Sequence, residues 1–423
     1  MDSLLLFRFV LPCTLLLLLP SSSEAYDPLD PNGNITIRWD ILSWTGDGYV
    51  AAVTLNNFQQ YRHIQEPGWS LGWTWAKNEI IWQMIGGQTT EQGDCSKFKG
   101  QVSPHCCKKD PVAVDLIPGA PYSEQVANCC KGGVLTSLKQ DPANAVASFR
   151  VVVGRAGTTT KSVRLPKNFT FKSPGPGYTC GPARIVKPTR FLRYDKRRVT
   201  QAMMSWNVTC TYSQFLAAKA PTCCVSLSTF YNDTIVSCPT CACGCQSGNC
   251  VDPNSPNLTS VISNPGNNGI TCTSHSCPIR VHWHVKQNYK QYWRVKVTIT
   301  NFNYRMNYSD WNLVIEHPNF DNLTQLYSFN YGSLIPYGGS MNDTAMLWGI
   351  KFFNDLLMQA GPLGYVQSDL LFGKDKSTFT FHEGWAFPRR IYFNGDNCVM
   401  PPPDVYPRLP NAGSQQKASP YLL

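Results

Sequence analysis

The segment that decides the fold is residues 49–75, which read YVAAVTLNNFQQYRHIQEPGWSLGWTW. Its first part alternates with a period of two, which predicts a β-strand. A polar loop closed by Pro67-Gly68 follows. Large apolar residues then recur at every second position, at Trp69, Leu71, Trp73 and Trp75, so a second strand carries all four on one face. Four such side chains are more than a thin sheet usually needs, and they indicate a surface on which a flat ligand can stack.

This segment belongs to an internal repeat with an offset of 244 residues. The matched positions are Ile35/Ile279, Ile37/Val281, Trp39/Trp283, Ile41/Val285, Tyr49/Trp293, Val53/Val297, Leu55/Ile299 and Asn57/Asn301. After a loop two residues shorter, Trp69 and Leu71 match Trp311 and Leu313. Both copies end with Phe-Thr-Phe, at 169–171 and 379–381, before a cysteine and prolines. The repeat predicts an all-β, disulfide-rich chain of two related β-sandwich domains separated by a Cys-rich segment.

The overall composition is that of a globular protein. The 423 residues are 43% hydrophobic and 15% charged, and this length favours about two to three domains. The formal net charge is +10. We interpret this excess as favouring an acidic exterior partner, such as cell-wall polymers or lipid headgroups, over nucleic acid. The alternative is a soluble basic protein with no such partner.

Three features place the chain in the secretory pathway. Residues 1–25 have the apolar run and the small-x-small end, Ser23-Glu24-Ala25, of a signal peptide, and no later stretch is long and apolar enough to span a bilayer. Of 18 cysteines, Cys13 leaves with the signal, so an odd number remains to form disulfides. Eight Asn-x-Ser/Thr sites are candidates for N-glycosylation: Asn34, Asn168, Asn207, Asn232, Asn257, Asn307, Asn322 and Asn342.

The chain divides into four parts after the signal. Residues 26–182 form the first domain, with a Cys-rich insert at 95–130 in which each adjacent cysteine is expected to bond to a different partner. Residues 183–270 form a Cys-rich central segment, which includes the basic run at 190–198 and a linker from 252. Residues 271–403 form the second domain, with one helical-looking stretch at 354–359. Residues 404–423 form a flexible tail.

Two patterns have the spacing of metal ligands, and neither favours a metal. Cys238, Cys241, Cys243 and Cys245 have zinc-like spacing, but a secreted chain favours a disulfide knot. His275, His282 and His284 fit surface or core histidines better than metal ligands. We therefore predict no metal and no cofactor.

Catalytic patterns are also weak. Gly68–Gly72 matches the G-x-S-x-G nucleophile motif, but the motif needs a turn and a helix, whereas the period of two continues through Ser70. A glycosidase needs two carboxylates that flank the scissile bond. Candidates are Glu66, Glu79, Asp94, Glu316 and Glu383, and no arrangement singles out a pair. No catalytic residue is predicted.

The aromatic residues give the sharpest binding hypothesis, because a sugar ring packs its apolar face on an aromatic ring. The repeat partners of Trp39 and Trp69 are also tryptophans, so these two are predicted to be core. Trp44 and Trp75 align with Asn288 and His317, and a position that is aromatic in one copy and polar in the other is not expected to be a shared core site. We therefore predict a surface that binds crystalline polysaccharide, whose first candidates are Trp44 and Trp75. The further candidates are Tyr49, Trp73 and Trp82.

Several long motifs then resemble the plant COBRA-like protein family, of the Brittle culm group. They are YDPLDPNGNITIRWDILSWTGDGYVA, GDCSKFKG, PGPGYTCGPA, TCTYSQ, TCCVS, CPTCACGC, SHSCPIRVHWHVKQNYK, TNFNYRMNYSDW, GWAFPRRIYFNGDNC and MPPPDVYPRLPN. The resemblance covers essentially the whole mature chain. It implies an extracellular, N-glycosylated protein with an N-terminal cellulose-binding module and a Cys-rich centre that carries the CCVS motif, Cys223, Cys224, Val225 and Ser226. It also implies a non-enzymatic role in cellulose deposition, microfibril orientation and oriented cell expansion.

The chain end departs from the family pattern. Residues 411–414, NAGS, resemble the attachment site of a GPI anchor, but only QQKASPYLL follows, where an anchor signal needs roughly 10–20 apolar residues. We expect an unanchored secreted form, or a chain end that differs from the usual gene model; an anchored form would lie on the outer face of the plasma membrane. Two rival functions remain open: an extracellular scaffold that binds a protein partner, and a wall glycosidase.

Overall fold

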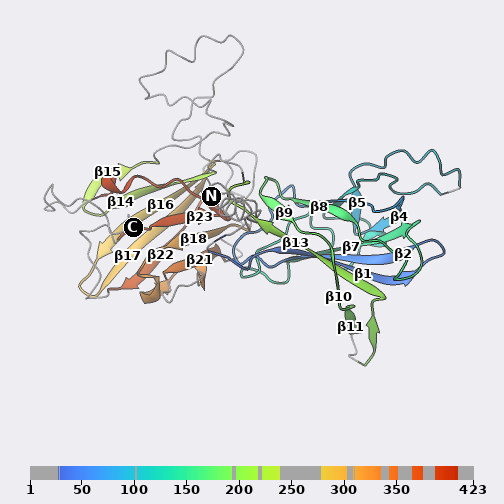
Figure 1. Ribbon diagram of the computed structural model, residues 1–423. Coiled ribbons are helices and arrows are strands. Elements are labelled where there is room, and N and C mark those ends of the chain that lie inside the picture. The colour runs from blue at the N-terminus through green and yellow to red at the C-terminus, as the bar shows by residue number, and fades with distance from the viewer. Residues whose placement is uncertain are drawn as a thin grey trace, which may run out of the picture.

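The computed structural model describes residues 27, 29–100, 102–192, 197–217, 222–238, 278–302, 308, 310–334, 343–350, 364–374 and 386–407. The described chain is almost entirely β-structure, arranged as two domains that lie end to end (Figure 1). Among the described residues, no helix is long and apolar enough to cross a membrane. The signal peptide, the linker from 252, the helical-looking stretch at 354–359, the second Phe-Thr-Phe and most of the tail lie outside this part of the chain.

The first domain is a sandwich of two sheets. The larger sheet has the order β10 (Arg184–Val186), β13 (Met204–Tyr212), β1 (Ile35–Trp44), β2 (Tyr49–Asn57), β7 (Val146–Gly154) and β4 (Ile80–Ile85), with β9 (Tyr178–Cys180) paired to β13. The facing sheet has the order β5 (Gly87–Thr89), β6 (Val112–Asp115), β3 (Ser70–Thr74) and β8 (Lys167–Lys172). Alternate residues of both sheets meet in one continuous core, which includes Trp39, Trp73 and Phe171.

The second domain repeats this arrangement with a core of its own. Its larger sheet has the order β15 (Asn232–Val236), β14 (Cys223–Thr229), β16 (Ile279–Asn288), β17 (Tyr292–Asn301), β22 (Tyr365–Gly373) and β19 (Leu323–Leu326). Its facing sheet has the order β20 (Phe329–Leu334), β21 (Thr344–Gly349), β18 (Asn312–Glu316), β23 (Arg390–Phe393) and β24 (Asp396–Asn397). The predicted all-β fold with two domains is confirmed.

The repeat extends to strand register. Ile35 pairs with Asn57 in β1–β2, and Ile279 pairs with Asn301 in β16–β17. Both hairpins carry an irregularity at the same place, between Ile41 and Ser43 in one and between Val285 and Gln287 in the other. The neighbouring strand differs: β13 runs antiparallel to β1, whereas β14 runs parallel to β16. The two sandwiches are therefore related but not identical in topology.

The boundary between the domains lies later in the chain than predicted. The predicted first domain ends at residue 182, but β10 and β13 from the predicted central segment complete its larger sheet. Strands β14 and β15 from the same segment belong to the second domain. The first three residues of the basic run form β11 (Arg190–Leu192), which pairs with β12 (Val199–Gln201) in a ribbon that projects from the first domain (Figure 1).

A third, smaller cluster joins the domains. It contains Leu29 and Tyr61 from the first domain and Val314, Leu334, Met346 and Tyr392 from the second. Asn312 is fully buried and donates from Nδ2 to the Tyr61 carbonyl oxygen at 2.7 Å. Lys139 donates from Nζ to the carbonyl oxygen of Ser333 at 2.6 Å. Apolar burial and these two hydrogen bonds together fix the two sandwiches against each other.

Five disulfides cross-link the described chain. They are Cys95–Cys107, Cys129–Cys130, Cys180–Cys210, Cys223–Cys398 and Cys224–Cys238. The prediction that each adjacent cysteine of the insert bonds to a different partner agrees with the pairing of Cys107 with Cys95 and is wrong for Cys129 and Cys130. These two bond to each other, with Cys130 at a φ of 67°. Cys106 is a buried free thiol. Cys241, Cys243 and Cys245 lie outside the described residues.

Candidate functional site

Three of the five predicted stacking aromatics are core residues, which corrects the hypothesis for them. Tyr49 is 1% exposed, and Trp73 and Trp75 are each 2% exposed. The ring of Trp39 lies edge-on to both of these tryptophans, with centroid distances of 5.4 Å to Trp73 and 6.2 Å to Trp75, and stacks on Trp206 at 5.5 Å. These rings fill the space between the two sheets, so they have no free face for a ligand.

The comparison of repeat copies is misleading at Trp75 because its partner His317 is also buried. His317 is 1% exposed, and its ring stacks on those of Trp283 at 5.7 Å and Phe372 at 5.9 Å. An imidazole is a planar ring that packs among aromatic residues. A change from Trp to His between the copies therefore does not mark the position as a surface site.

Trp44 and Trp82 keep part of their surface exposed. Trp82 lies on β4, at the end of the first domain that is remote from the second domain (Figure 1), and Trp44 is next to the β1–β2 turn. Trp44 ends β1 and packs only partly against the core. The ring of Trp82 lies 5.7 Å from that of Phe98, which is held in the loop closed by Cys95–Cys107. The guanidinium of Arg155 lies 4.4 Å from the centroid of the Phe98 ring. We name Trp44, Trp82, Phe98 and Arg155 the hairpin end.

Close packing holds this end in place. A Cβ atom on Gly154 would lie 2.2 Å from the Trp82 indole nitrogen and 2.9 Å from the Asp47 carboxylate, so only glycine allows this approach. Asp47 lies in the β1–β2 turn and accepts a hydrogen bond from the Arg155 backbone N–H at 3.2 Å. The turn that follows Trp44, the turn that carries Arg155 and the Trp82 ring are therefore packed against one another.

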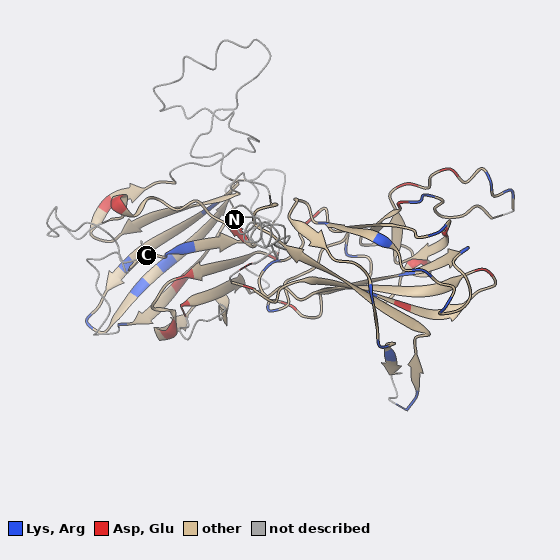
Figure 2. Ribbon diagram, viewed as in Figure 1, with Lys and Arg blue, Asp and Glu red and all other residues tan. Residues whose placement is uncertain are grey.

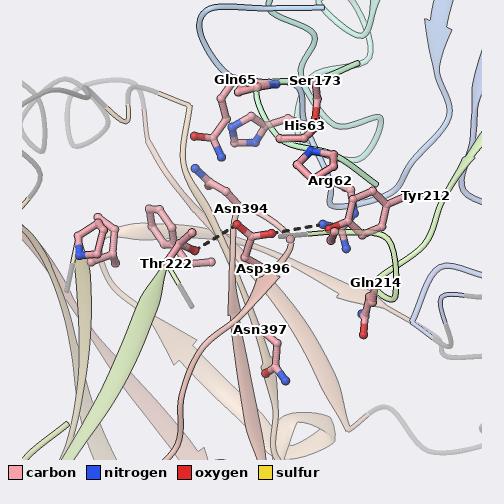
Figure 3. A pocket seen from close by; sticks show the side chains of 18 of the residues that line it. Arg62, His63, Gln65, Ser173, Tyr212, Gln214, Thr222, Asn394, Asp396 and Asn397 are labelled. Carbon is pink, nitrogen blue, oxygen red and sulfur yellow. Dashed lines mark hydrogen bonds and ion pairs between the residues drawn. The ribbon is translucent and has the colours of Figure 1, made fainter. Parts of the chain in front are cut away.

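A second candidate is a cleft between the domains, with a volume of about 540 Å³ (Figure 3). Its polar lining comes from both domains: Gln65, Ser173, Tyr178, Tyr212 and Gln214 from the first domain and its end, and Thr222, Asn394, Asp396 and Asn397 from the second. Aromatic rings beside amide groups are typical of sugar-binding sites. Sequence reasoning missed this cleft because its residues are scattered along the chain.

Arg62 occupies the cleft and links the domains through it. Its side chain is 6% exposed, and its guanidinium lies 3.4 Å from Asp27 and 3.8 Å from Asp396 of the second domain. The guanidinium also stacks 3.6 Å from the centroid of the Tyr212 ring. A Cβ atom on Gly177 would lie 2.5 Å from Tyr212, so Gly177 approaches the same ring closely. Arg62 thus covers one face of this ring and joins the domains, which favours a structural role for the cleft.

The charge balance of the cleft is close to neutral. Enclosure within the cleft raises the pKa of Asp396, although 42% of its side chain is exposed and the positive charge of Arg62 and a hydrogen bond from Thr222 oppose the shift. Burial, together with the charge of Arg62, lowers the pKa of His63 to about 4, so this ring is neutral near pH 7. The ion pair of Arg62 and Asp396 leaves little net charge to attract an ionic ligand.

The candidate glycosidase carboxylates do not meet in this cleft. Asp396 is the one carboxylate among its described lining residues. Glu79 is buried and accepts a bond from the Lys77 backbone N–H at 2.5 Å, whereas Glu316 is buried beside Tyr392 at 3.3 Å and burial raises its pKa. Glu66 and Asp94 are exposed residues outside the cleft lining, and Glu383 lies outside the described residues. The described cleft therefore lacks the carboxylate pair of a two-carboxylate glycosidase.

The CCVS motif is a structural strand. Cys223 and Cys224 form disulfides with Cys398 and Cys238, and Val225 is fully buried. The Ser226 hydroxyl lies 2.6 Å from Nδ1 of His282. The motif thus fastens β14 to β16 and to the end of the second domain.

Ser70 and the two described histidines of the candidate metal pattern, His282 and His284, lie within strands of the sandwiches. Ser70 lies in the straight strand β3 rather than at a strand-to-helix turn. Both ring nitrogens of His282 contact serine hydroxyls, Ser226 at 2.6 Å and Ser228 at 2.8 Å, and Nδ1 of His284 lies 2.7 Å from Ser228. These contacts account for the two described histidines. His275 lies outside the described residues.

Five of the eight glycosylation candidates are described. Asn168 and Asn322 are exposed, whereas Asn34, Asn207 and Asn232 are half-buried. Asn257, Asn307 and Asn342 lie outside the described residues. Asn168 and Asn322 are the most accessible acceptors, and their glycosylation remains a prediction.

Two protein-family models match this chain. The one described as COBRA N-terminal domain matches residues 49–213, and the one described as COBRA family C-terminal domain matches 222–265 and 258–407. The first match ends just after β13 and the second begins just before β14, where the structure also changes from one domain to the next.

Similar proteins span nearly the whole chain. COBRA-like protein 1 of Arabidopsis thaliana is 73% identical over 403 residues, which cover 93% of this chain and 89% of that protein. Protein COBRA of Arabidopsis thaliana is 69% identical and covers 94% and 90%. COBRA-like protein 1 of Oryza sativa subsp. japonica is 69% identical and covers 99% and 96%. A crystal structure of a GH20 exo-β-N-acetylglucosaminidase from Vibrio harveyi matches 30% of this chain and 18% of that chain at 12% identity, and its TM-score of 0.21 carries no argument.

Proposed function

Because this chain belongs to the COBRA family of cell-wall proteins, we propose that it is a secreted, non-enzymatic glycoprotein that binds cellulose and helps to orient microfibrils during cell expansion. The disulfides of the structure support a secreted, extracellular location, because such bonds persist in oxidising compartments. The family names are not enzyme names, and the described cleft has a single carboxylate.

The observation that carries the cellulose proposal is the hairpin end. Trp44 and Trp82 are the predicted aromatics that keep part of their surface exposed, and they lie at a rigid tip together with Phe98. Cellulose presents flat rows of sugar rings whose C–H faces pack on aromatic rings. A rigid tip contacts such a surface with little loss of conformational entropy.

The size of the expected effect follows from ring area. If each indole covers roughly 60 Å² of sugar, at about 25 cal/mol per Å² it contributes about 1.5 kcal/mol. Two rings then account for about 3 kcal/mol, on the order of a 100-fold change in affinity.

The test is depletion of the secreted protein by crystalline cellulose. We expect Trp44→Ala/Trp82→Ala to lower the affinity on the order of 100-fold. The matched control is Tyr122→Ala/Phe215→Ala, which removes two rings that are 91% and 92% exposed elsewhere on the protein. Thermal unfolding checks that both variants fold. Equal binding by the wild type and the Trp variant would remove the hairpin end as the site, and no binding by the wild type would favour the protein-binding scaffold.

A further inference from the structure

The larger sheet of the second domain has a polar side that faces away from its core. Its apolar residues, such as Val281 and Val297, alternate into the core, so their neighbours point outward. Strand pairing aligns the outward residues in rows across the sheet. One row contains Ser226, His282, Thr298 and Gln367, and the next contains Ser228, His284, Lys296 and Asp369.

This side is strongly basic. It carries Arg280, Lys286, Arg294 and Lys296, and Asp369 is the one acidic residue in strands β14, β16, β17 and β22. Figure 2 shows Lys and Arg positions gathered on the strands of this sheet. We name these four cations and Asp369 the basic sheet face.

The single carboxylate is shared. Lys286 Nζ lies 3.1 Å from Asp369 Oδ2, and Arg294 donates to the same oxygen. Lys296 is the cross-strand neighbour of Asp369, and no described carboxylate forms an ion pair with Lys296 or Arg280. The face therefore keeps a net positive charge after its internal ion pairs are formed.

The polar groups of the face are held in place. Ser226, His282, Ser228 and His284 form a continuous hydrogen-bonded chain with contacts of 2.6 to 2.8 Å. Burial, followed by the charges of His284 and Arg280, lowers the pKa of His282 to about 4. Burial and the charges of Lys296 and Lys286 lower the pKa of His284. Both rings are thus neutral hydrogen-bonding groups near pH 7, beside fixed cations.

Exposed tyrosines border the cations. Tyr292, Tyr327 and Tyr365 are 41%, 48% and 57% exposed, and the Arg294 guanidinium lies 5.2 Å from the centroid of the Tyr327 ring. No large aliphatic residue of β14, β16, β17 or β22 is exposed. Cations, imidazole groups and tyrosine rings therefore lie on one side of this sheet, while the buried hydroxyls of Ser226 and Ser228 hold the imidazoles in place.

We propose that the basic sheet face binds an acidic polysaccharide of uronic acid units. Each unit offers a carboxylate for Lys or Arg, hydroxyl groups for Thr298 and Gln367, and a C–H face for tyrosine. Strands lie about 4.8 Å apart, so a chain that crosses β16, β17 and β22 meets a new donor at each of these strands. A membrane partner is less favoured because no large aliphatic side chain is exposed on β14, β16, β17 or β22, and the exposed Ile235 of this sheet lies on its edge strand β15.

This site lies in the other domain from the hairpin end and goes beyond the proposed cellulose function. Its test uses the full secreted chain and soluble polygalacturonate, with fully methyl-esterified polygalacturonate as the uncharged comparison. We expect the wild type to bind the charged polymer at low salt and to lose binding at high salt, because screening weakens charge–charge attraction. The esterified polymer should bind at least tenfold more weakly.

Three variants make the test specific. Arg294→Gln/Lys296→Gln should weaken binding to polygalacturonate at least tenfold. Asp369→Asn should strengthen it, because it removes the one acidic group of the face. The matched control is Lys167→Gln/Lys172→Gln, which removes the same charge from exposed positions on β8 of the first domain and should change binding less than twofold.

Each outcome is decisive. Equal losses in the two double variants would show attraction by net charge alone and would overturn the proposal. Binding to vesicles of phosphatidylcholine and phosphatidylserine, without binding to polygalacturonate, would assign the face to a membrane instead. Depletion by cellulose is measured on the same variants; it should not change, so failure of this proposal is distinguished from failure of the cellulose proposal.

Discussion

Replacement of Arg62 by methionine tests whether this residue fastens the two domains. Methionine fills a similar volume but cannot form the ion pairs with Asp27 at 3.4 Å and Asp396 at 3.8 Å, or stack its charge on Tyr212 at 3.6 Å. The Arg62 and Asp27 side chains are 6% and 10% exposed. The variant therefore leaves a buried carboxylate without its cation.

The expected loss of stability is dominated by that carboxylate. Removal of one partner of a buried ion pair costs about 3–5 kcal/mol. The Asp396 side chain is 42% exposed, so solvent screens its pair and this partner adds at most about 1 kcal/mol. These terms are not additive, and we expect Arg62→Met to lower the free energy of unfolding by about 3–5 kcal/mol.

Urea unfolding of the wild type and of four variants, Arg62→Met, Arg150→Met, Asp27→Asn and Asp27→Asn/Arg62→Met, measures this loss. Arg150→Met is the matched control, because Arg150 is an exposed strand residue, and it should change stability by less than about 0.5 kcal/mol. In an Asp27→Asn background, Arg62→Met should cost about 2 kcal/mol less, because no buried charge is left alone. A loss below about 1 kcal/mol, or the same loss in both backgrounds, would refute this role for Arg62.

Three further predictions concern named buried groups. Burial raises the pKa of Asp30 to about 6. Protonation of Asp30 therefore stabilises the folded protein by as much as about 3 kcal/mol at low pH, and this stabilisation is lost as the pH rises from about 4 to 6. Asp30→Asn should lack this dependence, and its stability relative to the wild type, measured by urea unfolding, should rise by about that amount between pH 4 and pH 7; parallel curves would contradict the assignment. Trp73→Ala should lower the free energy of unfolding by about 3–5 kcal/mol and Trp82→Ala by less than half as much, because Trp73 is 2% exposed and Trp82 is half-buried. Equal shifts in urea midpoint would contradict a core position for Trp73 and a half-buried position for Trp82. Asn312→Leu should cost about 2–3 kcal/mol by the same assay, because the buried Tyr61 carbonyl loses its 2.7 Å donor; an unchanged midpoint would show that water replaces it.

The repeat allowed the fold to be predicted because it is visible at the level of strand register. The pairing of Trp39 with Val53 reappears as the pairing of Trp283 with Val297 at the same offset of 244 residues. Side-chain alternation then determines which residues face each core. The domain boundary was not predictable in this way, because β13 and β14 are both apolar alternating strands and only three-dimensional pairing assigns them to different sheets.

The candidate sites were harder to predict from the sequence, because they also depend on three-dimensional packing. Periodicity identifies the face on which Trp73 and Trp75 lie, but it does not say whether a second sheet covers that face. Here β3 belongs to the facing sheet, so its tryptophans close the core instead of binding a ligand. Arg62 gave no signal, because its partners Asp27 and Asp396 are 35 and 334 residues away in the chain.

The domain interface fixes the position of the two proposed surfaces relative to each other. The hairpin end lies at the remote end of the first domain, and the basic sheet face lies on the second domain (Figures 1 and 2). Arg62, Asn312 and the apolar cluster around Tyr61 hold the domains in one arrangement, so the separation between the surfaces is set by the fold and not by a flexible linker. A rigid link loses little entropy when both surfaces are engaged, but it permits this only where the two polymers lie at the matching separation. We therefore expect the interface to add selectivity for a particular arrangement of neutral and acidic polysaccharide, which neither proposed surface supplies alone.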